Sequence, residues 1–111
     1  MDSHRTALER LRDQAAGEIA ALDADLHALF EASRADNADD EHDPEGATIA
    51  YERAQLTAVL AAARAQLEAV NEALSRLDAG TYGRCESCGR AIASERLEIR
   101  PFATTCIDCA S

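Results

Sequence analysis

The sequence from Cys85 to Cys109, CESCGRAIASERLEIRPFATTCIDC, contains all four cysteines of this 111-residue chain. They form two Cys-x-x-Cys pairs with 17 residues between them. Two pairs at this separation are typical of a zinc ion held by four thiolates. The pattern therefore predicts one structural zinc ion, bound by Cys85, Cys88, Cys106 and Cys109.

Other uses of paired cysteines fit this sequence less well. Redox-active Cys-x-x-Cys motifs occur near β-α-β patterns, which neither pair has. A catalytic zinc ion keeps one position for water, whereas four thiolates close the coordination sphere. A zinc ribbon that binds nucleic acid needs a basic surface, but this chain has 21 acidic residues, 11 arginines, no lysine and a formal net charge of −10. We therefore expect no catalytic residues and no sequence-specific binding to DNA.

The segment that carries the cysteines, residues 80–111, is below the size that folds on an apolar core alone. Its expected core is very small and consists of Ile92, Leu97, Ile99, Pro101 and Phe102. Zinc binding must therefore supply much of its folding energy. The negative charge of the thiolates is expected to be offset by four nearby arginines, Arg84, Arg90, Arg96 and Arg100.

The preceding residues, 1–79, show the apolar periodicity of two long helices. In the first, residues 3–35, apolar side chains recur every three or four positions, at Leu8, Leu11, Ala15, Ile19, Leu22, Leu26 and Leu29. In the second, residues 44–77, the corresponding positions are Ile49, Leu56, Leu60, Ala63, Leu67, Val70, Leu74 and Leu77. Because this spacing forms a coiled-coil seam, we expect a mainly α protein. It would be a long antiparallel coiled-coil hairpin (residues 1–79) followed by a small C-terminal four-cysteine zinc-finger module (residues 80–111).

The composition agrees with this architecture. Apolar residues make up 47 % of the chain, but 25 residues are alanine and none is tryptophan. Such a composition suits helices packed closely along one seam. There is no run of 18 apolar residues and no layout of a signal peptide at the N-terminus. We expect a cytoplasmic protein without a membrane partner, in a compartment where paired cysteines favour metal over disulfides.

The expected turn between the helices, residues 36–46, holds six carboxylates and no lysine or arginine. Two interpretations stay open for it. It is either a solvated loop that is polar for solubility, or a carboxylate tip that enters a site containing a divalent metal or arginine.

Three motifs behind an acidic-tipped hairpin resemble the DksA/TraR family of zinc-finger proteins. They are Tyr82-Gly83-x-Cys85-x-x-Cys88-Gly89, Arg96-Leu97-x-x-x-Pro101 and Cys106-Ile107-x-Cys109. The resemblance implies a bacterial transcription regulator that is not an enzyme. It also implies that RNA polymerase is the partner and that the hairpin enters the secondary channel of the polymerase. An adaptor whose hairpin pairs with another helical protein, or with itself, is the alternative.

The resemblance also implies which residues form the contact tip. The family motif Asp-x-x-Asp-x-Ala falls on this chain with its aspartates at His42 and Glu45 and its alanine at Ala47. Together with the carboxylate of Asp43, these residues form the expected polymerase-contact tip. Guanosine tetraphosphate is a further partner that the resemblance implies. No residues are assigned to bind it as a cofactor, although Arg96 and Arg100 are available.

Overall fold

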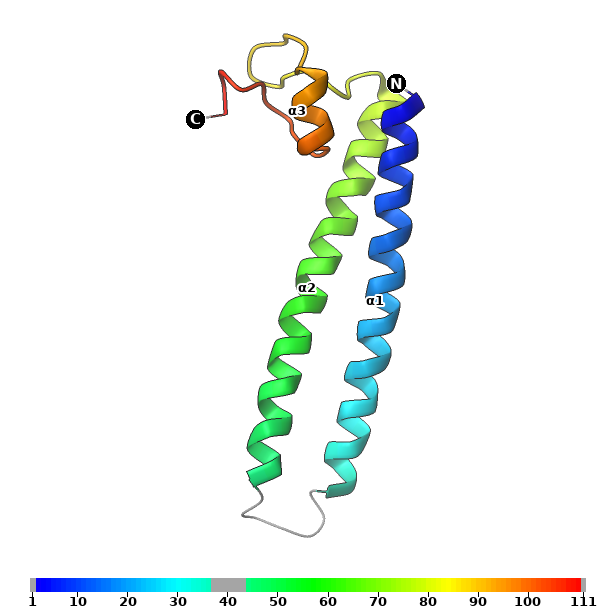
Figure 1. Cartoon of the computed structure of the whole chain (residues 1–111), viewed down its shortest axis with the longest axis vertical. Coiled ribbons are helices and arrows are strands. Elements are labelled where there is room, and N and C mark those ends of the chain that lie inside the picture. The colour runs from blue at the N-terminus through cyan, green and yellow to red at the C-terminus, as the bar shows by residue number, and fades with distance from the viewer. Residues whose placement is uncertain (1, 37–43, 111) are drawn as a thin grey trace. The chain divides into compact units, whose positions relative to one another are not determined.

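The computed structural model describes the backbone of residues 2–36 and 44–110 and the side chains of residues 3–32 and 47–110. This part of the chain forms three helices: α1 (Asp2–Asp36), α2 (Pro44–Ala79) and α3 (Ser94–Ile99) (Figure 1). Within the same residues there is no strand, only an isolated antiparallel bridge between Arg84 and Ala91. The predicted mainly α fold is confirmed. None of the described helices is both long enough and apolar enough to cross a membrane.

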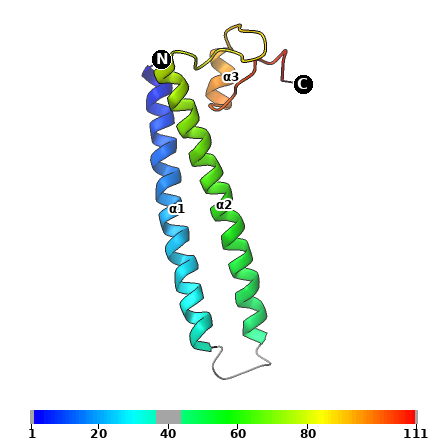
Figure 2. The same cartoon turned by 180° about the vertical axis from the view of Figure 1, so that it is seen from behind.

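The chain divides into two compact units. The first unit combines Met1–Gln14 with Leu67–Ser111, and the second is Ala15–Gln66. In each unit a segment of α1 runs antiparallel to a segment of α2, as the front and back views agree (Figures 1 and 2). The expected domain boundary between residues 79 and 80 differs from this division and stays a prediction.

The second unit is held by the predicted seam. Its buried residues are Ala15, Leu60 and Ala63, and its half-buried apolar residues are Ile19, Leu22, Leu26, Leu29, Ile49 and Leu56. Polar contacts join the two helices as well. The guanidinium of Arg64 donates to Asp23 at 3.2 Å, and that of Arg53 lies 4.8 Å from the ring centroid of Phe30. Because these contacts are largely exposed, packing along the seam contributes more to stability than they do.

In the first unit, α2 ends in a Schellman motif. The N–H of Gly80 donates to the carbonyl of Leu77 at 3.1 Å, and the N–H of Thr81 donates to that of Arg76 at 2.9 Å. Gly80 has a φ of +77°, the left-handed conformation that this cap needs and that glycine adopts without strain. This cap turns the chain from α2 toward the first cysteine pair.

One apolar core joins the helices of this unit to the cysteine segment. It contains Leu8 of α1 and Val70 and Ala73 of α2, which are fully buried, together with Tyr82, Cys85, Ile92 and Leu97. Leu11, Leu74, Leu77 and Phe102 pack against this cluster. The cysteine segment therefore completes its core with the beginning of α1 and the end of α2.

The expectation that Ile99 belongs to this core is wrong. Its side chain is 81 % exposed, whereas Leu97 is 5 % exposed. Both lie on α3, where successive residues are rotated by about 100°. A residue two positions after the inward-facing Leu97 therefore points to the opposite side of this short helix.

Candidate metal centre

The four cysteines come together at one point of the first unit. Their four Sγ atoms all lie within 4.8 Å of one another, and Cys88 Sγ is 3.7 Å from Cys106 Sγ. Cys85 is buried, Cys106 and Cys109 are half-buried, and Cys88 is exposed. Among the described residues, no histidine or carboxylate belongs to this cluster. It therefore offers sulfur ligands alone.

The first cysteine pair is shaped by a tight loop. The N–H of Cys85 donates to the carbonyl of Arg90 at 2.8 Å, and the N–H of Gly89 donates to that of Cys85 at 2.9 Å. Gly89 has a φ of +77°, so glycine is the residue that makes this turn without strain. Next to the loop, Gly83 has a φ of +80°, and a Cβ there would lie 3.3 Å from Leu97 Cδ1. A side chain at residue 83 would thus press against the core under the cysteines.

The second pair closes its own turn and is tied to the first by one backbone hydrogen bond. The N–H of Cys109 donates to the carbonyl of Cys106 at 3.1 Å, which closes the second turn. The N–H of Glu86 donates to the carbonyl of Thr104 at 2.9 Å and so joins the two loops. Arg96 Nε of α3 donates to the carbonyl of Thr105 at 3.1 Å. Arg96 therefore anchors the chain that enters the second pair.

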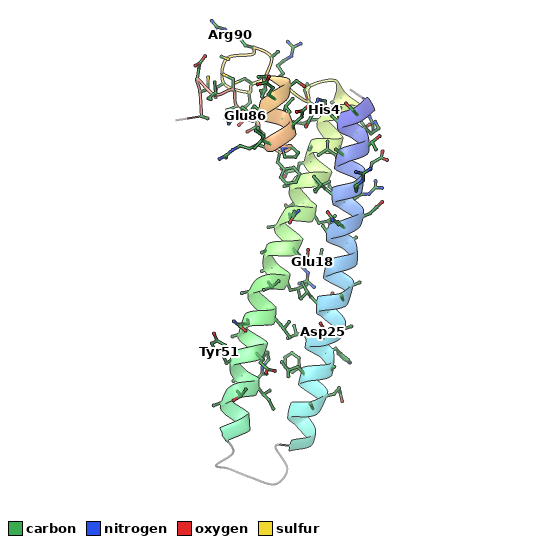
Figure 3. The ribbon with its side chains drawn as sticks, viewed as in Figure 1. His4, Glu18, Asp25, Tyr51, Glu86 and Arg90 are labelled. Atoms are coloured by element: carbon green, nitrogen blue, oxygen red, sulfur yellow. The ribbon has the colours of Figure 1, made fainter. Side chains whose placement is uncertain are left out.

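Tyr82 connects the metal centre to the helices. Its hydroxyl donates to the carbonyl of Pro101 at 3.0 Å, across 19 residues of sequence. The centroid of its ring lies 5.7 Å from the ring centroid of His4. His4 is at the start of α1 (Figure 3). Burial raises the pKa of Tyr82, and the charge of Arg76 opposes this rise. The phenol is thus kept neutral where it supports the loop.

The cysteines differ in how readily they ionise. The pKa of Cys85 is lowered to about 6, chiefly by the backbone N–H of Cys106 and further by those of Cys88 and Ser87, while burial opposes this. The pKa of Cys109 is raised to about 12, chiefly by the thiol of Cys106 and then by that of Cys85. The pKa of Cys88 is also raised. Hydrogen bonds from the Arg90 backbone and from the Cys109 thiol lower it, but desolvation and the thiols of Cys85 and Cys106 outweigh them.

The cluster fits a zinc ion. In a tetrahedral site with Zn–S bonds of about 2.3 Å, neighbouring sulfurs lie about 3.8 Å apart. The separation of 3.7 Å between Cys88 and Cys106 matches that value. Four thiolates this close together repel one another, so a cation is needed to balance their charge, and the raised pKa values of Cys88 and Cys109 agree with this. Sulfur-only ligation favours zinc over harder cations such as magnesium or calcium.

Zinc binding is expected to release protons and to strengthen as the pH rises. Near neutral pH, Cys85, with a pKa of about 6, is mostly a thiolate, whereas Cys109, with a pKa of about 12, must release its proton to the solvent when zinc binds. Protons therefore compete with zinc, and the affinity falls as the pH is lowered from about 8 to about 6. Competition with a chromophoric chelator at several pH values measures this slope. An affinity that does not change with pH would contradict thiolate ligation.

The residues expected at the hairpin tip are placed only in part. His42 and Asp43 lie outside the described residues. Glu45 belongs to the first turn of α2, but its side chain is also outside the described part. Ala47 lies on α2 with its side chain exposed. The role of this tip stays a prediction.

Three residues support the metal centre in a way that the sequence analysis did not predict: Ala73, Leu8 and Tyr82, of which Tyr82 was noted only as part of the motif. Leu8 appears in the sequence as one more seam position, and Ala73 lies outside the seam. Tyr82 gave a usable signal, because it is an aromatic residue three positions before Cys85 in a chain with only two tyrosines. The contacts of Leu8 and Ala73 join segments that are far apart in the sequence, so no local pattern reports them.

Comparison with known proteins agrees with this geometry. A family model described as the prokaryotic dksA/traR C4-type zinc finger matches residues 80–111. A solved structure, that of the transcription factor DksA2 from Pseudomonas aeruginosa, superposes with a TM-score of 0.58 at 30 % sequence identity. That match covers 91 % of this chain and 78 % of the other.

Curated relatives show the same likeness over shorter stretches. The RNA polymerase-binding transcription factor DksA of Haemophilus influenzae is 41 % identical over 46 residues, which is 41 % of this chain and 32 % of that protein. General stress protein 16O of Bacillus subtilis is 38 % identical over 72 residues, which is 65 % of this chain and 44 % of that protein. The chain thus spans less than half the length of the curated relatives it matches. The cysteine cluster, the matching family model and the extended likeness to DksA2 together show that the chain belongs to the DksA/TraR family of zinc-finger proteins.

Proposed function

We propose that this protein is a transcription regulator that binds bacterial RNA polymerase. The observation that carries the proposal is the likeness to the transcription factor DksA2 over 91 % of the chain at 30 % identity. The name of the Haemophilus relative, an RNA polymerase-binding transcription factor, supplies the partner. Such a protein acts in the cytoplasm, where the polymerase is, and is not an enzyme.

The distribution of charge supports a role for the helical hairpin in this binding. Residues 1–79 carry 17 acidic residues and 7 arginines, and residues 80–111 carry four of each. The formal net charge of −10 therefore lies entirely in the hairpin. We infer that the hairpin enters the secondary channel of the polymerase and that His42, Asp43, Glu45 and Ala47 form its contact tip. Carboxylates there suit a site that contains a divalent cation or arginine.

The zinc ion has a structural role in this proposal. Cys85, Cys88, Cys106 and Cys109 are its four ligands, and together they leave no position for a water molecule. The ion joins two turns that the backbone hydrogen bond from Glu86 to Thr104 also connects. It thereby fixes the segment that packs on the beginning of α1 and the end of α2.

The tip is tested by neutralising two of its charges. Asp43→Asn/Glu45→Gln should still co-purify with core polymerase, because the rest of the hairpin keeps its contacts. Its effect on open-complex lifetime should fall at least about tenfold, because neutralising the carboxylates removes the charge contacts that the tip makes. Glu68→Gln/Glu72→Gln, with two exposed carboxylates elsewhere on α2, is the matched control and should act as the wild type does. Co-purification and in-vitro transcription, with and without guanosine tetraphosphate, provide the measurements.

Each outcome of this test has a clear meaning. A wild-type protein that neither co-purifies with polymerase nor changes open-complex lifetime would refute the proposed function. A stable dimer in light scattering that survives the tip substitutions, without any binding to polymerase, would favour the adaptor instead. Equal activity of the tip variant and the wild type would remove the tip from the proposal and leave the binding intact.

A further inference from the structure

An arginine occupies a seam position of the hairpin in the part of α2 that begins at the tip. Residue 53 lies four positions after Ile49 and three before Leu56, which are both seam residues. Steps of four and three are those of a heptad, so residue 53 is the seam position between them. The structure agrees, because Arg53 is half-buried like these two residues, whereas Glu52 and Ala54 beside it are exposed.

Phe30 of α1 holds this arginine in place. The guanidinium carbon of Arg53, Cζ, lies over the Phe30 ring at 4.8 Å from its centroid. A cation in this position is attracted by the negative face of the ring. Both residues belong to the second unit, so the contact is formed within one compact part of the molecule.

The hydrogen-bond donors of Arg53 are not used within the described part of the chain. Its guanidinium makes no hydrogen bond or ion pair with any residue whose side chain the structure describes. Arg64, on the same helix, is by contrast paired with Asp23 at 3.2 Å. The second unit carries 11 acidic residues and three arginines, so carboxylates are plentiful around Arg53. Its donors therefore remain for a partner outside this part of the chain.

A charged residue at this position costs stability. A seam position normally buries an apolar side chain, and a polar residue there lowers the stability of a coiled coil. Leucine at residue 53 would continue the apolar seam from Ile49 to Leu56 without a break. The contact with Phe30 offsets only part of this cost, because the phenylalanine is 43 % exposed and water weakens the attraction. Positions where a sequence departs from the pattern of its own fold are typically functional.

We propose that Arg53 binds a carboxylate of core RNA polymerase and that Phe30 positions the guanidinium for this contact. The inference rests on the proposed function and adds a contact that is separate from the tip. Arg53 lies nine residues after Pro44, where α2 begins, which is about 14 Å along the helix. Arginine suits a carboxylate because its planar guanidinium binds one through two parallel hydrogen bonds.

The charges around Arg53 favour a protein carboxylate over a nucleic acid. A phosphate backbone brings a row of negative charges, which the 11 acidic residues of the second unit would repel. A carboxylate on a protein surface is a single negative charge, and basic side chains next to it can face the acidic residues of the hairpin. We therefore expect the partner to be a protein surface of mixed charge.

Arg53→Leu separates this contact from a structural role, because the two predict opposite effects on stability. The variant completes the apolar seam, so its midpoint of thermal unfolding should rise by at least about 2 °C. Its affinity for core polymerase should nevertheless fall at least about tenfold, because a carboxylate of the polymerase loses its partner. A variant that unfolds at a lower temperature than the wild type and also binds weakly would make Arg53 a structural residue and overturn the proposal.

Arg64→Leu is the matched control for this substitution. It also removes an arginine of α2, but one that is exposed and paired within the chain. Its affinity for core polymerase should stay within about twofold of that of the wild type. A tenfold loss in this variant as well would show that the polymerase responds to the total charge of the hairpin, which would contradict a specific contact at Arg53.

The positioning role of Phe30 is tested with Phe30→Leu, alone and combined with Arg53→Leu. Leucine keeps an apolar side chain at residue 30 but removes the ring face over which the guanidinium lies. The single variant should bind polymerase at least about threefold more weakly, and it should add nothing to the loss in Arg53→Leu, because both residues act through one contact. Additive losses would show that Phe30 contributes by itself, and its positioning role would be wrong.

A photo-crosslinking residue in place of Thr57, one turn after Arg53, identifies the partner. The expected crosslink is to a polymerase segment with an acidic residue, whose neutralisation should weaken binding of the wild type but not of Arg53→Leu. A crosslink to nucleic acid, to a second copy of this chain or to a segment without carboxylates would overturn the proposal. If the wild type binds polymerase and Arg53→Leu binds equally well, the contact is wrong while the proposed function stands. Failure of the wild type to bind would refute both.

Discussion

Removal of zinc is expected to unfold residues 80–110 while α1 and most of α2 stay helical. The module has one helix of six residues, and its own buried side chains are Tyr82, Cys85, Ile92 and Leu97. Structural zinc binding contributes on the order of 10–16 kcal/mol in small zinc-finger peptides, which is as large as the stability of a whole domain. A chelator, or Cys85→Ser or Cys106→Ser, removes this contribution. Hydrogen exchange followed by mass spectrometry should then show loss of protection across the module.

This experiment has an internal control and a decisive negative result. Ser87→Ala changes an exposed residue between the first two cysteines and should keep about one zinc ion per chain and full protection. Elemental analysis reports the zinc content of every variant. Protection that persists in residues 80–110 after all zinc has been lost would show that the apolar core is sufficient, and it would contradict the structural role of the metal.

Leu8→Ala is expected to weaken zinc binding although Leu8 lies 77 residues before Cys85 in the sequence. Leu8 is fully buried in the same core as Cys85, and Cys106 and Cys109 pack against that core. Truncating a buried leucine costs about 2–5 kcal/mol. Zinc binds the folded module, so a variant whose folded form is less stable binds zinc with lower apparent affinity. Each 1.4 kcal/mol of lost stability corresponds to about a tenfold loss of affinity, so we expect a loss of at least about tenfold. Chelator competition and thermal unfolding with and without zinc measure the two effects.

Leu26→Ala provides the comparison for this prediction. Leu26 is a half-buried seam residue of α1 in the second unit, and its truncation should lower the stability of the helices without changing the affinity for zinc. Different zinc affinities for the two variants would show that the beginning of α1 belongs to the metal-binding unit. Equal affinities would show that the module binds zinc independently of α1.

Much of the fold was predictable because it depends on short-range patterns. Apolar residues at steps of three and four form a seam on any helix, so the two long helices follow from positions such as Leu22 and Leu60 alone. The end of α2 at Gly80 was predictable for a similar local reason, since glycine adopts the left-handed cap conformation without strain. The placement of Ile99 failed because composition indicates which residues are apolar, whereas the rotation of α3 decides which of them are buried.

The spacing of the four cysteines is enough to predict a zinc site, since ligand type and loop length restrict the metal and its geometry. Only the tertiary structure shows that Leu8, Ala73 and Tyr82 complete the core beneath that site, because those contacts join segments far apart in the sequence. The tertiary structure likewise brings Ile107 and Arg100 to the lining of one cavity, because the chain returns around the cysteines. Local periodicity thus accounts for the helices and the metal. Long-range packing decides what supports the metal and which side chains of the module lie together.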